Sequence, residues 1–418
     1  MTISQSQLGV RLRQARESTG MTQDEVGREL GISRSAVTLI ESGTRAVSSL
    51  ELDRLAFLYG RDIRDFFAAE FGSENALSGL FRRNRDIADD PKSTSALRRC
   101  MAVGRELTNL ERLIGIDRDP ASAVRYNLSA PRSKFDAIRQ GTAIAEQERR
   151  RLGIGNAPVV DVTELLEKHG VRTALVDLPE DISGLTVFDV EAGALVVTNR
   201  DDHLLRRNFS FAHEYAHVLL DWDSTGRISR GSERTDSIEV RANAFAANLL
   251  MPEDGVHEVL RALGKGTQGR LLAETPVDDD RAVGIEARGI PAVSKIQMHD
   301  VVLLAHHFGV SRQVVLYRLR NVKLVSDREL QELLSEEQAG HGRQLEQLLD
   351  LPEPDHARER NRFRHRFLSL ALEAYRRGAI SRGKLEELFA TILEKKREEV
   401  DLANYIANEP PTPVEIPS

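Results

Sequence analysis

The chain has 418 residues, 40% hydrophobic and 29% charged, which is typical of a globular protein of about two to four domains, and no run of 18 uncharged apolar residues suggests a transmembrane helix. Its single cysteine, Cys100, excludes an internal disulfide, and no secretory signal pattern is seen at the start, so we expect a cytoplasmic protein without a membrane segment. The net charge of −7 (58 − 65) excludes DNA binding through overall charge, so any DNA contact must come from a local patch.

Residues 1–72 have the pattern of four or five short helices. Thr22 and Glu25 have the capping-box spacing, in which each side chain can bond the backbone amide of the other. Gly31 then supplies a turn, and Ser33 can cap the next helix. Short helices joined by such a turn predict an all-α helix-turn-helix domain.

The stretch from Met21 to Gly43 resembles the Cro/phage-repressor (XRE) type of helix-turn-helix regulator, over about residues 6–66. The resemblance implies a double-stranded DNA operator as partner and a homodimer on a two-fold site. Residues 1–72 carry nine Lys and Arg against ten Asp and Glu, so this region lacks the net positive charge that favours binding to DNA. A helical module that contacts only proteins is therefore the alternative.

The start of the third helix carries the expected DNA-reading side chains. Val37 and Ile40 face the core, which leaves Arg34, Ser35 and Thr38 exposed where a recognition helix enters the major groove. Arg34 suits a bidentate contact to guanine, whereas the two hydroxyl residues are ambiguous readers. Three more residues match family positions that meet phosphates or base edges: Gln23, Ser42 and Arg45.

Residues 73–150 are polar and helical by pattern, and they predict a helical connector. After residue 150 the pattern changes to short β-branched runs, which predict a small sheet with a hairpin turn at Glu191–Gly193. The expected strands are 171–176, 185–188 and 194–198. Helices are expected to follow at about 203–220 and 237–250.

His213, Glu214 and His217 form a His-Glu-x-x-His pattern on the first of these helices. Residues four apart share one helical face, so both imidazoles can reach one zinc ion with Glu214 beside them. Zinc needs a further protein ligand, and Glu239 on the next helix is preferred over Glu233 and Asp236, the alternative carboxylates in the polar loop before that helix. Asn243, one turn further along, could orient a ligand. An amphipathic helix with incidental histidines is the alternative, which the second helix disfavours.

Together with this motif, the stretch from Glu239 to Pro252 resembles the ImmA/IrrE family of metallopeptidases, over about residues 151–324. The resemblance implies an α+β zincin-like peptidase domain, so we expect a mainly α chain with a small β-sheet. It also implies a protein substrate, commonly a helix-turn-helix repressor. The roles that it implies are zinc binding by His213, His217 and Glu239, and catalysis by Glu214. Arg241 departs from the carboxylate common in relatives.

The expected mechanism follows from this ligand set. Zinc held by two imidazoles and one carboxylate keeps a position open for water and lowers the pKa of that water. Glu214 would take the proton as the water attacks a peptide carbonyl, and would return it to the leaving amine. No residue of the sequence stands out as the hydrogen-bond donor that would stabilise the oxyanion formed during this attack.

The peptidase domain is expected to span residues 151–330. Within it, residues 264–297 lack periodicity and predict a mobile loop. The segment 298–324 repeats a helix-turn-helix-like pattern, which we interpret as a packing element rather than a second DNA reader. Residues 331–418 predict a helical C-terminal region with a polar tail.

These features predict a DNA-binding regulator with a zinc endopeptidase that cleaves a repressor-type protein to switch stress, prophage or mobile-element genes. The substrate is supplied in trans or is the chain itself, cut within 73–150. Manganese is the alternative metal in vitro, and single-stranded DNA is a trial activator. The rival hypothesis is a non-enzymatic transcription factor whose peptidase-like domain senses a ligand or partner.

Overall fold

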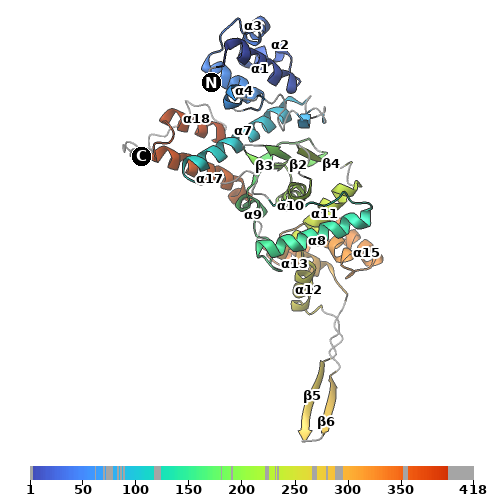
Figure 1. The fold of residues 1–418 in the computed structure, drawn as a ribbon. Helices are drawn as coiled ribbons and strands as arrows, with labels where there is room; N and C mark the ends of the chain where they lie inside the picture. The colour runs from blue at the N-terminus through green and yellow to red at the C-terminus, as the bar shows by residue number, and fades with distance from the viewer. Residues whose placement is uncertain are drawn as a thin grey trace.

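A computed structural model of the chain is mainly helical, with a small mixed β-sheet, as the sequence predicted (Figure 1). Backbone alone is described for Pro91 and for 271–278, 281–287 and 356–363. The described residues are 3–61, 63–68, 71, 79–81, 84, 87, 90–116, 124–179, 181–189, 192–221, 226–230, 232, 235–265, 271–278, 281–287, 295–351 and 356–393.

The N-terminal helices are short because each begins at a capping side chain and ends within a few turns. The predicted capping box of Thr22 and Glu25 is confirmed, and Gly31 ends the helix in the left-handed conformation, with φ of 71°. Their core contains Val37 and Ile40, as expected. The elements are α1 (Gln5–Ser18), α2 (Gln23–Leu30), α3 (Arg34–Glu41), α4 (Ser49–Leu58) and the 3₁₀ helix η1 (Ile63–Phe67).

A four-stranded sheet has the order β1-β3-β2-β4, and its strands are β1 (Val171–Val176), β2 (Ile182–Asp189), β3 (Gly193–Asn199) and β4 (Gly226–Arg230). β1 runs parallel to β3, whereas β2 is antiparallel to both β3 and β4. The predicted strands are confirmed, and the pairing of Asp189 with Gly193 confirms the hairpin. β4 was not predicted, because its sequence contains two arginines and no apolar alternation.

Helices cover both faces of the sheet (Figure 1). On one face, Leu97 and Met101 of α7 (Pro91–Leu113) pack against Leu185 and Val197. Side chains from the alternate strand positions face α10 (Leu204–Leu220). Behind α10 lie α8 (Lys134–Leu152) and α11 (Ser237–Leu250), while α9 (Val162–Lys168) precedes β1.

The segment 73–150, expected to be a connector, is built into this fold where it is described. Leu97 and Leu107 of α7 are fully buried, and α8 approaches α11 so closely that a Cβ on Gly141 would lie 2.3 Å from the carbonyl oxygen of Arg241. The expected boundary at residue 150 falls inside α8. The sequence underestimated this packing because α7 and α8 place their apolar residues on narrow stripes between charged ones. The arginine run at 82–85, apart from Asn84, lies outside the described residues.

The expected loop at 264–297 was wrong in its central part. An antiparallel hairpin forms from β5 (Leu271–Asp278) and β6 (Arg281–Ala287), and it projects away from the helices (Figure 1). Pro276 and the acidic residues around the turn hid this strand pattern in the sequence. The hairpin follows α12 (Glu253–Ala262) and precedes α13 (Met298–Phe308), α14 (Arg312–Asn321), α15 (Asp327–Gln338) and α16 (His341–Leu348).

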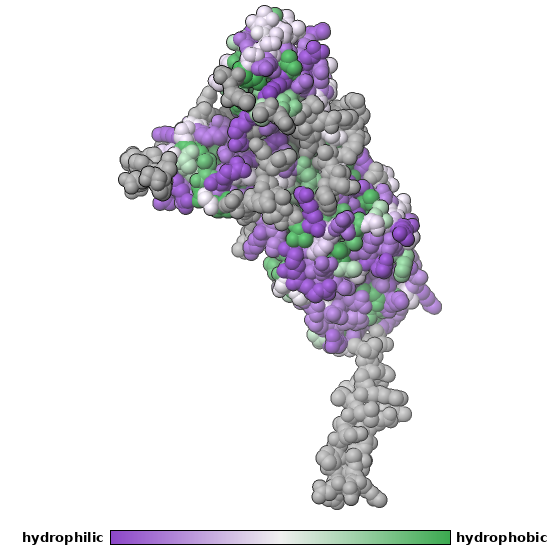
Figure 2. Space-filling view, viewed as in Figure 1, coloured by the Kyte–Doolittle hydropathy of each residue, from purple (hydrophilic) through white to green (hydrophobic). Residues whose placement is uncertain are grey.

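The C-terminal region returns to the other end of the fold. α17 (His356–Arg376) and α18 (Arg382–Leu393) pack against the second half of α7, where Phe367 and Leu385 meet Val103 and Leu107. The predicted polar tail from Asn408 lies outside the described residues. The described surface on the face drawn in Figure 2 is predominantly hydrophilic, with scattered apolar patches. Among the described helices, none is long and apolar enough to cross a membrane.

Candidate metal centre

α10 carries the histidine motif inside the fold rather than on its surface. Its apolar neighbours, such as Phe211 and Ala212, pack between the sheet and α11, which brings the motif with them. His213 is 6% exposed, whereas Glu214 and His217 are completely buried. Buried polar groups of this kind must be compensated by specific partners, so their contacts define the site.

The two histidines converge on Glu239 of α11. His213 Nε2 lies 3.0 Å from Glu239 Oε2, and His217 Nε2 lies 3.6 Å from Glu239 Oε1. The two Nε2 atoms are 3.2 Å apart. One ligand atom from each of the three residues lies within 4.8 Å of the others, and all three residues are buried. The structure therefore brings together the three residues that the sequence singled out.

This donor set fits a zinc ion. Two imidazoles and one carboxylate make a three-ligand site that leaves a coordination position open. Oε1 of Glu214 is buried beside the cluster without a hydrogen-bond partner, whereas Oε2 accepts a 2.7 Å bond from the hydroxyl of Thr186. An orphaned carboxylate oxygen is costly in a dry interior, so it indicates that a polar group belongs next to it.

Gly184 on β2 makes room for Glu214. A Cβ at this position would lie 2.8 Å from Glu214 Oε1 and 2.9 Å from its Cγ. Any larger residue would therefore push the carboxylate away. This role of Gly184 could not be predicted, because the contact joins a strand to a helix 30 residues away.

Each histidine is held through its other ring nitrogen. Asn243 Oδ1 lies 3.0 Å from His213 Nδ1, in the position that the sequence suggested for orienting a ligand. Asp221 Oδ2 lies 2.7 Å from His217 Nδ1 and also pairs, through Oδ1, with Arg241. Such partners fix the tautomer and the ring orientation of a metal-binding histidine. Asp221 was missed, although its place four residues after His217 put it on the same face.

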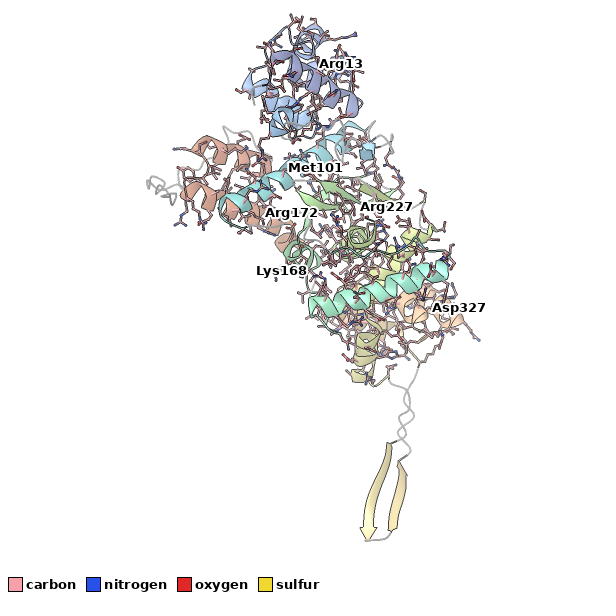
Figure 3. All side chains as sticks on the ribbon, in the orientation of Figure 1. Arg13, Met101, Lys168, Arg172, Arg227 and Asp327 are labelled. Carbon is pink, nitrogen blue, oxygen red and sulfur yellow. The ribbon has the colours of Figure 1, made fainter. Side chains whose placement is uncertain are left out.

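The unpredicted strand β4 adds two polar side chains to the cluster. Arg227 Nε donates a 2.8 Å bond to Glu239 Oε1, and the hydroxyl of Ser229 lies 3.2 Å from His213 Nε2 (Arg227 is labelled in Figure 3). Arg227 thus binds the same carboxylate oxygen that faces His217. No sequence signal marked either residue, because their position depends on the pairing of β4 with β2.

The charges of the cluster suit a cation. Burial opposes the charged form of Glu239, but hydrogen bonds with His213 and His217 outweigh it and hold the pKa of Glu239 well below its usual range. Burial also lowers the pKa of His217, but hydrogen bonds to Asp221 and Glu239 outweigh it and raise that pKa to about 9. A permanent carboxylate is thus presented to both imidazoles.

The expected DNA readers lie on the surface of the N-terminal helices. Arg34, Ser35, Thr38 and Ser42 are exposed, with Arg34 unpaired among the described residues. The two other expected contact residues are engaged within the domain. Gln23 Nε2 donates to Glu41 and its Oε1 accepts from Thr38, whereas Arg45 pairs with Glu51 at 2.7 Å.

The helix-turn-helix-like segment 298–324 is part of the core. Phe308, Val315 and Leu316 are nearly completely buried with the helices of the peptidase-like region. Arg312, at the start of α14, pairs with Glu337 and with Glu346. A recognition helix needs that end free, so these contacts favour the packing interpretation.

Comparison with known families agrees with the two resemblances. Residues 7–66 match the helix-turn-helix domain family, and residues 166–274 match the IrrE N-terminal-like domain family. Both resemblances are confirmed, and the chain joins a helix-turn-helix domain to a metallopeptidase-family domain. The cluster of His213, His217 and Glu239 and the four-stranded sheet lie within the second match. A search of curated proteins found no match to the chain.

Proposed function

We propose that this chain is a DNA-binding transcriptional regulator whose second domain is a zinc endopeptidase. The observation that supports it best is the buried cluster of His213, His217 and Glu239 with the free oxygen of Glu214 beside it. A non-enzymatic domain that used this fold only to bind a ligand or partner would not need three metal ligands and a proton acceptor. The proposed location is the cytoplasm, where the DNA is.

The proposed chemistry is hydrolysis of a peptide bond. A zinc ion in the site, or manganese in vitro, would polarise a water molecule and the substrate carbonyl. Glu214 accepts the proton at Oε1, because Thr186 already occupies Oε2. It then returns the proton to the leaving amine. His213, His217 and Glu239 hold the metal, while Asn243 orients His213.

The substrate is proposed to be a separate protein, with a helix-turn-helix repressor as the first candidate from the family resemblance. Self-cleavage within α7 is disfavoured, because its apolar side chains pack on the sheet face away from α10 and its metal cluster. Cutting there requires α7 to unfold and its residues to reach the other face. α8 is equally constrained by its packing on α11.

The DNA partner is proposed to be a two-fold operator bound by a homodimer. Arg34, Ser35 and Thr38 would face the bases, and Gln23, Ser42 and Arg45 would contact phosphates or base edges. Single-stranded DNA is retained as a trial activator of the peptidase. The rival function, a non-enzymatic sensor, has the same DNA-binding half but needs no proton acceptor at residue 214.

The test is a cleavage assay on a repressor encoded next to this chain's gene. Wild type, Glu214→Gln and Glu253→Gln are incubated with the repressor and zinc or manganese, with and without single-stranded DNA, and fragments are identified by mass. Glu253 is an exposed residue at the start of α12, so its variant is the matched control. We expect wild type and Glu253→Gln to cut and Glu214→Gln to fail. Equal cleavage by all three, or none by wild type, favours the sensor.

A further inference from the structure

Among the described elements, α7 contacts both the helix-turn-helix domain, through α4, and the sheet of the second domain. Arg105 on α7 donates a 2.9 Å hydrogen bond to the backbone oxygen of Gly60, just after α4, and also binds both carboxylate oxygens of Asp189 at the end of β2. One arginine thereby links both domains. Next to Arg105, the surfaces of the two domains leave a space between them.

A cavity of about 950 Å³ lies at this junction. Its walls come from α2 and α4 of the helix-turn-helix domain, from α7 and from α18. Pockets that bind small molecules have volumes of roughly 300–1,000 Å³ and often lie between domains. This cavity is large enough for a whole small molecule rather than a single ion.

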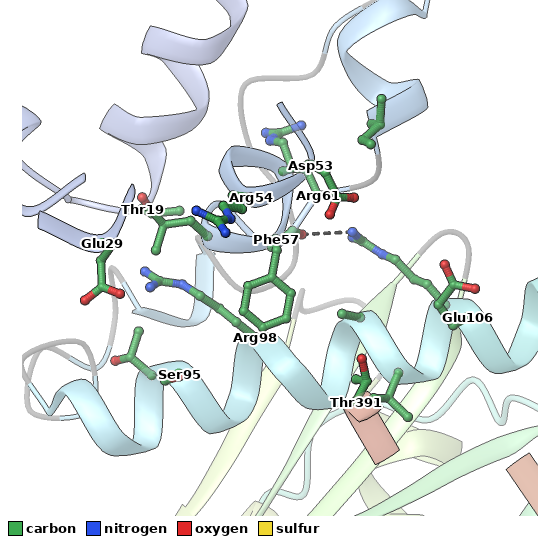
Figure 4. A pocket seen from close by; sticks show the side chains of 18 of the residues that line it. Thr19, Glu29, Asp53, Arg54, Phe57, Arg61, Ser95, Arg98, Glu106 and Thr391 are labelled. Atoms are coloured by element: carbon green, nitrogen blue, oxygen red, sulfur yellow. Dashed lines mark hydrogen bonds between the residues drawn. The ribbon is translucent and has the colours of Figure 1, made fainter. Parts of the chain in front are cut away.

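Arg98 of α7 points into the cavity beneath α4 (Figure 4). Its residue exposure is only 7%, and its Nε is buried without a hydrogen-bond partner. No ion pair reaches its guanidinium from the described residues, and its Cζ lies 5.8 Å from the centre of the Phe81 ring. The Nε of Arg98 is thus buried without compensation, which is unfavourable for a charged group. The geometry therefore indicates a missing anionic partner.

The acidic residues nearby do not supply that partner. Glu25 and Glu29 of α2 line the cavity and act on Arg98 only through space. Burial, opposed by the charges of Glu29, Tyr59 and Glu25, lowers the pKa of Arg98 to about 10. Arg54 of α4 also lines the cavity and has no partner among the described residues. Two unpaired guanidinium groups thus face one space.

Phe57 adds an apolar wall. Its ring lies beside Arg98 in the cavity, and the residue is 41% exposed (Figure 4). An exposed aromatic face beside arginines can stack on a flat ring while the arginines receive an oxyanion. That combination matches the two parts of a nucleotide.

We propose that the cavity between α2, α4 and α7 binds a small nucleotide, with its phosphate groups on Arg98 and Arg54 and its base on Phe57. The bound molecule contacts both domains, so it holds the helix-turn-helix domain against α7. The site is separate from the metal cluster, which lies on the opposite face of the sheet.

The test is calorimetric titration of the full-length protein with ATP, adenosine and inorganic phosphate. We expect ATP to bind with one site per chain and at least tenfold more tightly than either fragment. Arg98→Gln should weaken ATP tenfold or more, and Phe57→Leu should weaken ATP but not phosphate. Arg112→Gln is the matched control, because Arg112 is an exposed arginine on the same helix outside the cavity.

A second measurement, of melting temperature, distinguishes a loss of ATP binding from a loss of folding in the variant. Removing an uncompensated buried charge should stabilise the empty protein, so Arg98→Gln should melt at a higher temperature than wild type without ATP. Addition of ATP should raise the melting temperature of wild type and leave that of Arg98→Gln unchanged. Absence of ATP binding by wild type at millimolar concentration would overturn the proposal, as would equal binding by a folded Arg98→Gln variant.

Discussion

The carboxylate of Asp221 lies 2.7 Å from Nδ1 of His217, while Nε2 on the other side of the ring faces Glu239. Asp221 in turn pairs with Arg241, which is 2% exposed. The ring is therefore fixed from both sides, with a buried ion pair behind it. Arg241 thereby offsets the charge of Asp221, as Arg227 does for Glu239.

Asp221→Asn should weaken zinc binding by about 10–100-fold, because the ring of His217 loses its orienting carboxylate. The affinity is measured by competition with a chelator. Asp254→Asn, which changes an exposed carboxylate on α12, is the control and should bind as wild type does. Unchanged affinity in Asp221→Asn would show that the contact does not orient a ligand.

His217→Ala should abolish stoichiometric metal. We expect purified wild type to hold about one zinc per chain and the variant to hold far less, because one of three ligands is gone. Elemental analysis of both proteins measures this. His341→Ala, at the exposed start of α16, should retain wild-type zinc. Equally low zinc in all three proteins would sink the ligand assignment.

Arg34→Ala should cost about 1–3 kcal/mol on the operator and relax specificity at one base pair, because it removes a bidentate base contact. Binding is measured by fluorescence anisotropy on a site selected from random DNA. Arg13→Ala, which removes an exposed arginine paired with Glu17 on α1, is the control. A similar loss of DNA affinity in both variants would mean that Arg34 contributes only through its positive charge and not through a contact to a base.

Arg149→Met should destabilise the peptidase-like region. Arg149 is 3% exposed and donates to the backbone oxygens of Gly155, Ala157 and Leu249. Each buried oxygen left without a donor costs about 1–3 kcal/mol, so we expect a loss on the order of 3 kcal/mol or more. Chemical denaturation measures it, with the exposed neighbour changed in Arg150→Met as the control. A loss no larger than that of the control would contradict the role.

Glu148 should make stability depend on pH. Burial raises its pKa, but hydrogen bonds from Arg151, Tyr215 and Tyr126 outweigh burial, so the folded pKa is lowered. A lowered folded pKa gives stability that is present above the unfolded value, about 4.3, and is lost as pH falls through the folded value.

Wild type should therefore melt well above Glu148→Gln at pH 7, and the difference should shrink below about pH 4. Melting curves across this range measure it. Glu146→Gln, on the exposed side of the same helix, should follow wild type at every pH. A difference that stays constant with pH would show that the ionised form of Glu148 is not what stabilises the fold.

Much of the site could be predicted because it lies on two helices. The spacing of His213 and His217 alone sets their common face, and Asn243 follows one turn after Glu239. Arg227 and Gly184 could not be predicted in the same way. They reach the cluster only through the pairing of β2 with β4 and the packing of α10 on the sheet.

The same limit explains the errors in the fold. The capping box at Thr22 is local and was predicted, whereas the burial of α7 depends on residues about 70 to 290 positions further along the chain. The hairpin of β5 and β6 lacks the apolar alternation that marks a strand buried on one face. Its pairing is visible only in the structure.

The burial of α7 also affects synthesis of the protein. Its second half is covered by side chains of α17 and α18 that lie about 260 to 290 residues further along the chain. At about 5–20 residues per second, roughly 13–58 s of synthesis separate the two, and Val103, Leu107 and Leu110 lack this cover in the meantime. A chain that stops before residue 356 would leave this apolar stripe without its cover, so it should aggregate more readily than the full chain.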